Sequence, residues 1–482
     1  MKILMATSEF SPLASTGDLG DQIRILAVEL KRLGHDVSVV MPFYRPIREG
    51  NYDIRPTGVE FQINLGGKRA STDIVETTGP EEIQVFLVRR DEYFDRSGIY
   101  GGEGRAYEDN AERFIFFSKA TIELARRLSP SPELIHCHDW TTALVPVFVR
   151  DRQLAFLTVL TIHNLEHQGS FWSFDFGLTG LPGSYFGPRG LEFYGRLNFL
   201  KSGILYADAV TLPGEASLFE AFNPQHGFGL DAVLQENRFR TYGIPHGVDY
   251  SQTNPSLDKL LGRRRKSEET DAKLCCRKAL LEQLEVEENS NGIALALPIE
   301  PQDESAFGSV KPVLDLVLSV DTCLVVTGKA PEQDLAEIIV AERKYPTRFA
   351  YRPDADTRLR QLALAGTDVV LLPASLGFRG TNVLASMRYG TLPIVRTRGG
   401  VRQLVSDYDQ VSDSGSGFVY ANHSPMALWD SIRRAKQLYR QPDEWTKLVR
   451  RAQAVDFSWT ESAKAFAKLY ANLLRHRQAS PA

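Results

Sequence analysis

A glycine-containing segment near the N-terminus, "SPLASTGDLGDQI" at residues 11–23, joins a short apolar run to a long amphipathic stretch. A loop of this kind between a strand and a helix can hold a phosphate, because its backbone N–H groups and the positive end of the helix dipole point toward the anion. This loop carries two aspartates, Asp18 and Asp21, and no lysine or arginine. The negative charges of this loop would therefore repel the phosphate that its backbone geometry could bind.

Five of the loops that directly follow apolar runs of the chain stand out. They are 14–22, 136–142 "HCHDWTT", 161–169 "TIHNLEHQG", 243–249 "GIPHGVD" and 373–383 "PASLGFRGTNV". In open parallel sheets, ligands bind beyond the carboxyl ends of the strands. We therefore expect the functional side chains in these loops.

The elements that must position these loops follow a βαβ rhythm. Apolar runs at 83–88, 133–136, 156–162 and 206–212 alternate with helical-period segments such as 109–128. After residue 290 the pattern restarts with the runs "GIALAL", "TCLVVTG", "RFAYR", "DVVLLP", "LPIVRT" and "GFVY". Such alternation is typical of parallel sheets with helices on both faces. It predicts an α/β fold with two Rossmann-like domains, joined through the polar stretch 250–272.

Composition limits the class of protein. A chain of 482 residues is too long for one compact core, and its formal net charge of -4 argues against a surface dedicated to nucleic acid or to an anionic membrane. The basic run "GRRRK" within 250–272 is better explained as a solvated loop. There is no membrane-spanning apolar run, no signal-peptide pattern and no metal-ligand spacing of the four cysteines. We predict a cytoplasmic protein with no metal, no cofactor, and no nucleic-acid or membrane partner.

Segments along nearly the whole chain resemble those of the bacterial glycogen synthases and plant starch synthases, which transfer glucose from ADP-glucose to an α-1,4-glucan. The segments are "YFDRSGIYG" with "DNAERFIFFSKA" (93–120), "HCHDWTTALVP", "TIHNLEHQG", "GLEFYGRLNFLKSGILYADAV" (190–210), "GFGLDAVL" (227–234), "MRYGTLPIVRTRGG" (387–400), "GSGFVY" (415–420) and "DFSW" (456–459). Each alone would be a weak signal, whereas their order and spacing together are specific.

The resemblance implies the glycosyltransferase-B fold, in which two Rossmann-like domains face a central cleft. Together with the rhythm of the elements, it predicts an acceptor-side domain over 1–245 and a donor-nucleotide-side domain over 246–460. A C-terminal helix over 461–482 is then expected to return to the first domain.

The resemblance also implies roles for individual residues. A retaining glucosyl transfer must neutralise a departing diphosphate and stabilise a positively charged sugar ring. The family's sugar-side histidine and aspartate correspond to His163 and Asp139, the catalytic candidates. Substrate-binding positions correspond to Thr16, Gly17, Asp21, Asn164, His246, Gly380, Thr381 and Asn382.

The phosphate side departs from the family's pattern. The lysine position of the glycine loop holds Ser15, its second glycine is Asp18, and the position of the donor-sugar glutamate falls on Gly377. The segment "ALPIEPQDE" lacks the family's arginine and lysine, and His246 replaces an asparagine. A lysine about 4 Å from a phosphate is worth roughly 4 kcal/mol at an effective dielectric near 20. We therefore expect ADP-glucose to bind weakly or not at all.

The retained residues also have structural explanations. His163 could simply hydrogen-bond a strand end, and Asp139 could cap a helix that begins at Trp140. Gly17 and Gly380 could serve tight turns between strand and helix. The aromatic run "FWSFDF" at 171–176 could be a glucan platform, a lid or part of a core.

Three hypotheses follow. The first is a degenerate family member with little or no synthase activity, which binds glycogen or another α-1,4-glucan or regulates an active paralogue. The second is an active but rewired glucosyltransferase, in which Arg379, Arg398 and Arg402 supply new cations for the donor phosphates, because arginine binds phosphate through a bidentate fork. The third is a structural partner that binds no carbohydrate. Glucan affinity without turnover would separate the first hypothesis from the other two.

Overall fold

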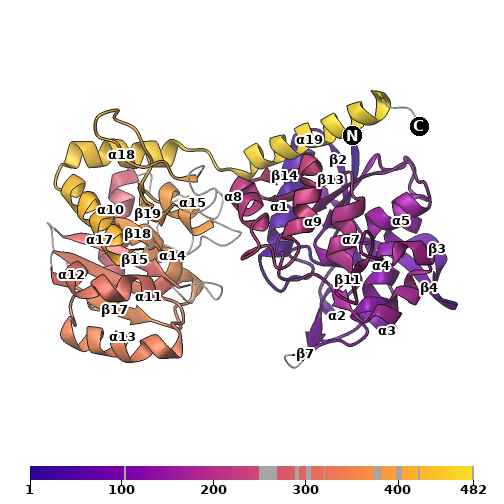
Figure 1. The fold of residues 1–482 in the computed structure, drawn as a ribbon, viewed down its shortest axis with the longest axis horizontal. Helices are drawn as coiled ribbons and strands as arrows, with labels where there is room; N and C mark the ends of the chain where they lie inside the picture. Colours follow the sequence, from indigo (N-terminus) through magenta and orange to yellow (C-terminus); the bar gives the residue numbers. More distant parts are fainter. Residues whose placement is uncertain are drawn as a thin grey trace. The chain divides into compact units, whose positions relative to one another are not determined.

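The computed structural model describes residues 1–102, 105–248, 269–287, 292–299, 306–319, 321–373, 381–397, 404–421 and 424–479. The chain divides into two compact units, which are seen as separate groups of elements in Figure 1. Unit 1 comprises Met1–His246 and Trp459–Ala482, and unit 2 comprises Gly247–Ser458. Each unit is built around one large sheet.

The sheet of unit 1 has nine strands in the order β14-β13-β9-β8-β1-β2-β5-β4-β3. The strands from β14 to β5 run parallel to one another. They are β1 (Lys2–Ala6), β2 (Asp36–Pro42), β5 (Gln84–Arg89), β8 (Leu134–His138), β9 (Leu157–Thr161), β13 (Ala209–Pro213) and β14 (Thr241–Ile244). Because these strands are parallel, the loops that follow β1, β8, β9 and β14 all leave from the same edge of the sheet.

An antiparallel hairpin extends this sheet, and the expectation of purely parallel sheets is wrong here. β3 (Arg55–Leu65) pairs with β4 (Lys68–Thr78), which in turn pairs antiparallel with β5. Gly66 and Gly67 connect the two strands, and both have positive φ angles, of 58° and 98°. A two-residue turn with two positive φ angles favours glycine and closes tight hairpins. The alternating run "EFQINLGGK" carried this signal, but the βαβ rhythm obscured it.

Helices cover the sheet of unit 1. In α1 (Asp18–Arg32) the buried residues include Ile23, Leu26, Ala27 and Leu30, a spacing of three and four residues that places them on one face. The other helices are α2 (Arg45–Glu49), α3 (Asp91–Phe94), α4 (Asn110–Ala125), α5 (Val145–Asp151), α6 (Phe176–Thr179), α7 (Phe199–Tyr206), α8 (Gly214–Ala221) and α9 (Asp231–Glu236).

The last helix, α19 (Trp459–Ala479), packs along α1 and belongs to unit 1 (Figure 1). Thr460 Oγ1 donates a hydrogen bond of 2.7 Å to Glu29 Oε2 of α1. Further along α19, the Tyr470 hydroxyl lies 2.8 Å from Nδ1 of His136, which is in β8. The final helix thus reaches the same strand ends as the loops described above.

Unit 2 contains a parallel sheet in the order β17-β16-β15-β18-β19-β20. Its strands are β15 (Ile293–Pro298), β16 (Thr322–Thr327), β17 (Phe349–Arg352), β18 (Val369–Leu372), β19 (Leu392–Arg396) and β20 (Phe418–Tyr420). The six apolar runs predicted after residue 290 form these strands, so that prediction is confirmed. The helices are α10 (Glu269–Leu284), α11 (Ala306–Val310), α12 (Leu314–Ser319), α13 (Glu332–Lys344), α14 (Thr357–Gly366), α15 (Thr381–Arg388), α17 (Pro425–Tyr439) and α18 (Pro442–Ala454).

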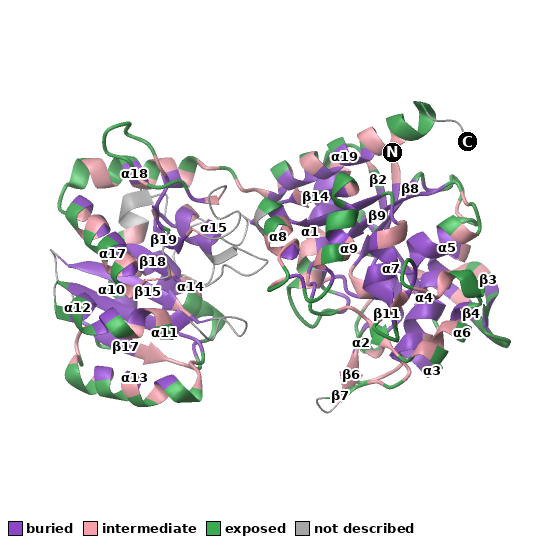
Figure 2. Ribbon diagram, in the orientation of Figure 1, coloured by how far each residue is buried: buried purple, intermediate pink, exposed green. Residues whose placement is uncertain are grey.

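Buried residues gather on the strands of both sheets, where Figure 2 shows them in purple. In unit 2 a buried ion pair fixes α10 on the sheet. Arg277 Nη1 lies 2.5 Å from Asp368 Oδ2, and the same oxygen accepts from the Ala294 amide at 2.7 Å. A buried pair is tolerated when further hydrogen bonds satisfy its remaining polar atoms.

The predicted connection at 250–272 is only partly described. The run "GRRRK" lies outside the described residues, whereas residues 269–272 form the first turn of α10. Within the described part of the chain, no helix combines the length and the apolar character that crossing a bilayer requires.

Candidate functional site

The first loop of unit 1, residues 7–17, connects β1 to α1 and closes on a carboxylate. The Glu9 side chain, which is only 2% exposed, accepts from the Thr16 amide at 2.6 Å and from Thr16 Oγ1 at 2.9 Å. It also accepts from the Tyr100 hydroxyl at 2.6 Å and lies 3.2 Å from Ser15 Oγ. A buried carboxylate is stable only when such donors satisfy its oxygens. Glu9 therefore uses the loop's own amide and hydroxyl donors.

The start of α1 adds more negative charge beside this loop. Asp18 and Asp21 lie in the first helical turn, and Gly17 at the N-cap receives no side-chain cap. Acidic side chains are stabilising here because they face the positive end of the helix dipole. Arg24 Nε lies 3.4 Å from Asp21 Oδ1. Ser15 Oγ donates a hydrogen bond of 2.6 Å to the Gly17 carbonyl oxygen. The stretch that resembles a phosphate loop thus combines three carboxylates with the side chain of one arginine.

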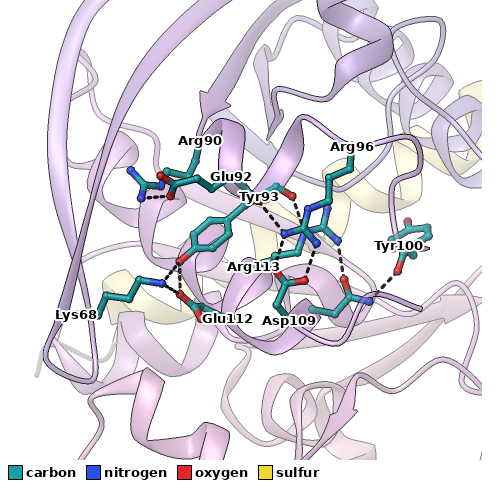
Figure 3. A network of polar contacts seen from close by, with 10 residues as sticks. Lys68, Arg90, Glu92, Tyr93, Arg96, Tyr100, Asp109, Glu112 and Arg113 are labelled. Carbon is teal, nitrogen blue, oxygen red and sulfur yellow. Dashed lines mark hydrogen bonds and ion pairs between the residues drawn. The ribbon is translucent and has the colours of Figure 1, made fainter. Parts of the chain in front are cut away.

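The segment that carries Tyr100 is held by the start of α4 (Figure 3). Arg113 is fully buried and donates from Nε to the Tyr93 carbonyl oxygen at 2.7 Å and from Nη1 to Asn110 Oδ1 at 2.6 Å. Asn110 Nδ2 in turn donates to the Tyr100 carbonyl oxygen at 2.8 Å. This network positions the Tyr100 ring so that its hydroxyl reaches the first loop.

Asp139 links the loops that follow two adjacent strands. Its φ angle is 57°, and its amide donates to the Thr161 carbonyl oxygen at 2.9 Å. Its Oδ1 accepts from the His163 amide at 2.7 Å and lies 3.4 Å from the Asn164 amide. Asp139 makes no capping hydrogen bond to the turn that begins at Trp140, so the capping explanation is wrong. The carboxylate instead holds the backbone that carries the candidate histidine.

Four histidines stack side by side at the carboxyl ends of β8, β9 and β14. We call His136, His138, His163 and His246 the histidine row. The ring centroids are separated by 4.1 Å, 5.3 Å and 4.9 Å along the row, and all four residues are buried. Both ends of the row touch α19: Tyr470 contacts His136, and Trp459 stacks on His246 with ring centroids 5.4 Å apart.

His163 forms one hydrogen bond to another histidine of the row and one to Gln22 of α1. Nδ1 of His163 lies 2.9 Å from Gln22 Oε1, and Nε2 of His163 lies 3.0 Å from Nδ1 of His138. In its neutral form, His163 donates to Gln22 and accepts from His138. Nε2 of His138 then carries a lone pair, and it has no hydrogen-bond partner among the described residues. Both ring nitrogens of His163 are thus engaged within unit 1.

Burial keeps the deeper members of the row uncharged. It lowers the pKa of His136 to about 3, with a smaller contribution from the charge of His163. Burial, and then the neighbouring His136 and His246, hold the pKa of His138 well below its usual range. Charging a ring in this row would place a cation in a poorly solvated environment beside other imidazoles. At neutral pH these two rings act as neutral hydrogen-bonding groups.

The structure brings together some predicted positions and not others. His163, Asp139, Asn164 and His246 meet at one edge of the sheet, and the first loop joins them through Gln22 of α1. Asn164 Oδ1 accepts from the Glu166 amide at 2.9 Å, which closes a local turn. Gly377, Arg379 and Gly380 lie outside the described residues, as do Arg398 and Arg402. Thr381 and Asn382 are the first residues of α15, and their side chains are not described.

Among the described residues, no cluster of three histidine, cysteine, aspartate or glutamate side chains could hold a metal ion. The described groups of this arrangement form hydrogen bonds through imidazoles, backbone amides and hydroxyls.

Comparison with known proteins places the chain among glucan synthases. The family model described as "Starch synthase catalytic domain" matches residues 2–236. The glycogen synthase of Syntrophotalea carbinolica is 33% identical over 476 residues, which covers 98% of each chain. That of Moorella thermoacetica is 33% identical over 491 residues, covering 100% of this chain and 98% of the relative. The chain belongs to the glycogen and starch synthase family.

Solved structures agree with this membership. The catalytic domain of starch synthase IV from Arabidopsis thaliana, bound to ADP and acarbose, aligns with a TM-score of 0.80 and 25% identity, covering 98% of this chain and 99% of that one. A sucrose-phosphate synthase from Thermosynechococcus elongatus aligns with a TM-score of 0.57 at 15% identity, a likeness of fold alone. The fold is the glycosyltransferase-B type with two Rossmann-like domains, as the family resemblance implied.

Three residues that contact this family site were not singled out from the sequence. Glu9 had a readable signal, because a carboxylate next to the buried run "ILMATS" must find donors. Tyr100 and Gln22 had none, since their roles arise only where distant segments meet: the Tyr100 hydroxyl bonds Glu9, and Gln22 bonds His163.

Proposed function

We propose that this family member binds α-1,4-glucan but elongates it from ADP-glucose slowly or not at all, so that its role in glycogen metabolism is binding or regulation of an active synthase. The observation that carries the proposal is the environment of the first loop. Glu9 binds the Thr16 amide at 2.6 Å, at a position where the family resemblance implies a diphosphate nearby.

Electrostatics supports this proposal. A departing diphosphate gains negative charge in the transition state, and preorganised cations and N–H donors are what stabilise it. Here Ser15 replaces the lysine that the resemblance implies, and Asp18 begins the helix. Glu9 is a buried carboxylate within the same loop. Losing one such contact typically costs about a hundred- to a thousand-fold in rate. Because the losses fall on the leaving group, we expect them in turnover as well as in donor binding.

The sugar side supports the glucan half of the proposal. The family's histidine and aspartate are kept as His163 and Asp139, and the Asp139 carboxylate fixes the His163 backbone at 2.7 Å. His163, whose backbone is held by Asp139, is kept on the sugar side, while the phosphate side is acidic. This combination favours recognition of a neutral polysaccharide over binding of an anionic nucleotide.

The decisive experiment is incorporation of radiolabelled glucose from ADP-glucose into glycogen by the purified chain. We expect negligible incorporation under conditions that saturate the glycogen synthase of Moorella thermoacetica as a positive control. Incorporation within about tenfold of a typical enzyme turnover of roughly 10 per second would overturn the proposal. Loss of such incorporation in a His163→Ala variant would then assign the activity to this chain and exclude a contaminating synthase.

Calorimetry with ADP and with ADP-glucose reports on the phosphate side directly. We expect dissociation constants of about 1 mM or weaker. Micromolar affinity that disappeared in an Arg379→Ala variant would instead support a rewired enzyme with its own phosphate-binding arginine.

A further inference from the structure

Unit 1 presents aromatic rings to solvent close to its three-stranded sheet. Trp172 is 63% exposed and Phe174 is 73% exposed, with ring centroids 4.3 Å apart and ring planes tilted by 42°. Tyr194, 84% exposed, packs edge-on against Phe193 at 4.6 Å. Rings of this size are seldom left in water in clusters without a partner.

The sheet brings the two pairs to the same end. β10 (Ser170–Phe171) and β11 (Glu192–Phe193) both pair antiparallel with the central β12 (Arg196–Asn198). Phe171 pairs with Leu197 and Phe193 pairs with Arg196. The chain therefore leaves β10 at Trp172 on the side where Tyr194 and Gly195 form the β11–β12 turn.

Packed aromatic side chains and hydrogen-bonded polar groups adjoin the exposed rings. The Phe171 ring is half-buried and packs against Phe199 with centroids 4.8 Å apart and against Trp140 at 5.7 Å. Arg196 on β12 is fixed by hydrogen bonds of 2.9 Å and 3.1 Å to Ser170. Fixed polar groups beside exposed rings can bond hydroxyls that the rings cannot.

The exposed hydrophobic side chains of the two units differ in kind. In the described part of unit 1, seven of the eight large hydrophobic side chains that are exposed are aromatic. In the described part of unit 2, the corresponding residues are aliphatic, namely Leu274, Leu316, Ile339, Val340, Val411 and Met426. Aromatic rings stack on the apolar faces of pyranose rings, whereas branched aliphatic side chains offer no flat surface for them.

We propose that Trp172, Phe174 and Tyr194 form a surface site for α-1,4-glucan, separate from the histidine row. Successive glucose units of an α-1,4-glucan are rotated relative to one another, so tilted rings match the chain better than coplanar ones. Arg196, whose guanidinium is held by Ser170, is placed to bond glucose hydroxyls at the edge of the rings. The site rests on the proposed glucan binding and adds the residues that provide it.

Affinity electrophoresis through native gels that contain glycogen tests the site. We expect the wild-type chain to be retarded and the double variant Trp172→Ala, Phe174→Ala to bind about tenfold more weakly or worse. Tyr194→Ala should weaken binding to a smaller degree. Phe239→Ala, which removes a ring 76% exposed on a different segment of unit 1, is the matched control and should migrate as the wild type does.

A second measurement is quenching of tryptophan fluorescence by maltoheptaose, which should be lost in Trp172→Phe while the thermal midpoint stays unchanged. Full retardation of the double variant would overturn the site but leave glucan binding intact. Absence of retardation in the wild type would overturn glucan binding itself. Light scattering tests for a contact between copies of this chain. If the wild type is a dimer and the double variant is a monomer with unchanged glycogen affinity, the surface is a dimer contact and the proposed glucan site is wrong.

Discussion

The first loop and the histidine row leave the same edge of the same parallel sheet, yet they are built in opposite ways. The end of the first loop and the start of α1, residues 15–18, are exposed. Three carboxylates lie in or beside this stretch, those of Glu9, Asp18 and Asp21. The histidine row is buried, its rings contact one another, and burial keeps His136 and His138 uncharged at neutral pH. One is a charged surface loop, and the other is an extension of the hydrophobic core.

This difference bears on the proposed loss of the phosphate side, because the two regions tolerate substitution to different degrees. The rings of the row pack between α1 and α19, so changing one of them would open a cavity or leave polar atoms without partners. The first-loop positions 15 and 18 face solvent, where replacing lysine and glycine by serine and aspartate costs little stability. The core contacts preserve the sugar side whether or not catalysis requires it.

Removing the carboxylate that holds the first loop should have the largest effect. Glu9→Ala leaves the Thr16 amide and the Tyr100 hydroxyl without their acceptor, at a cost of about 3 kcal/mol for the group of bonds. Hydrogen exchange of a peptide covering residues 13–17 should lose its protection while the histidine row keeps its own. Glu49→Ala, at an exposed position, is the control. Unchanged exchange in the variant would show that other contacts hold the loop.

Acid should act on the histidine row next. Because the pKa of His136 is about 3 in the folded chain and near 6.5 in the unfolded chain, protons bind preferentially to the unfolded state between these values. Lowering the pH from 6.5 to 5 should therefore reduce the stability of unit 1 by about 2 kcal/mol for this group alone.

Thermal unfolding of His136→Gln measures that contribution. The variant should be less stable than the wild type at pH 7 but should lose less stability on acidification. His476→Gln, at an exposed position on α19, should show the wild-type pH dependence. Equal slopes in wild type and His136→Gln would mean that carboxylates elsewhere cause the acid sensitivity.

The smallest effect should come from restoring the family's residues in the first loop. Ser15→Lys combined with Asp18→Gly adds a cation and removes an anion, and we expect ADP to bind about tenfold more tightly by calorimetry. Elongation of glycogen should not recover, because Gly377 and the segment 296–304 stay unchanged. Asp53→Lys, at a side chain 84% exposed, raises the net charge by the same amount and is the control. Recovered elongation would show that the first loop alone had silenced the enzyme.

Much of this architecture could be predicted because it depends on local patterns. The six apolar runs after residue 290 form the six strands of the unit 2 sheet, since a strand buried on both faces must be apolar along its length. The family segments likewise identified the loops at the strand ends. The hairpin at Arg55–Thr78 was missed although its two strands have 11 residues each, because their alternating pattern differs from the continuous apolar runs of the surrounding βαβ units.

The sequence by itself determined the family and the fold class, because these depend only on residue types and their order. It also places Ser15 and Asp18 where the family resemblance implies a lysine and a glycine. Tertiary structure alone decided which groups satisfy one another: Glu9 with Thr16 and Tyr100, His163 with Gln22 and His138, and Asp139 with the amides after β9 rather than with the turn at Trp140. It also decided that Phe171 packs half-buried against Phe199 while Trp172 faces water. A hydrogen bond or a stacked ring joins residues far apart in the chain, and their distance is set by the packing of whole strands and helices.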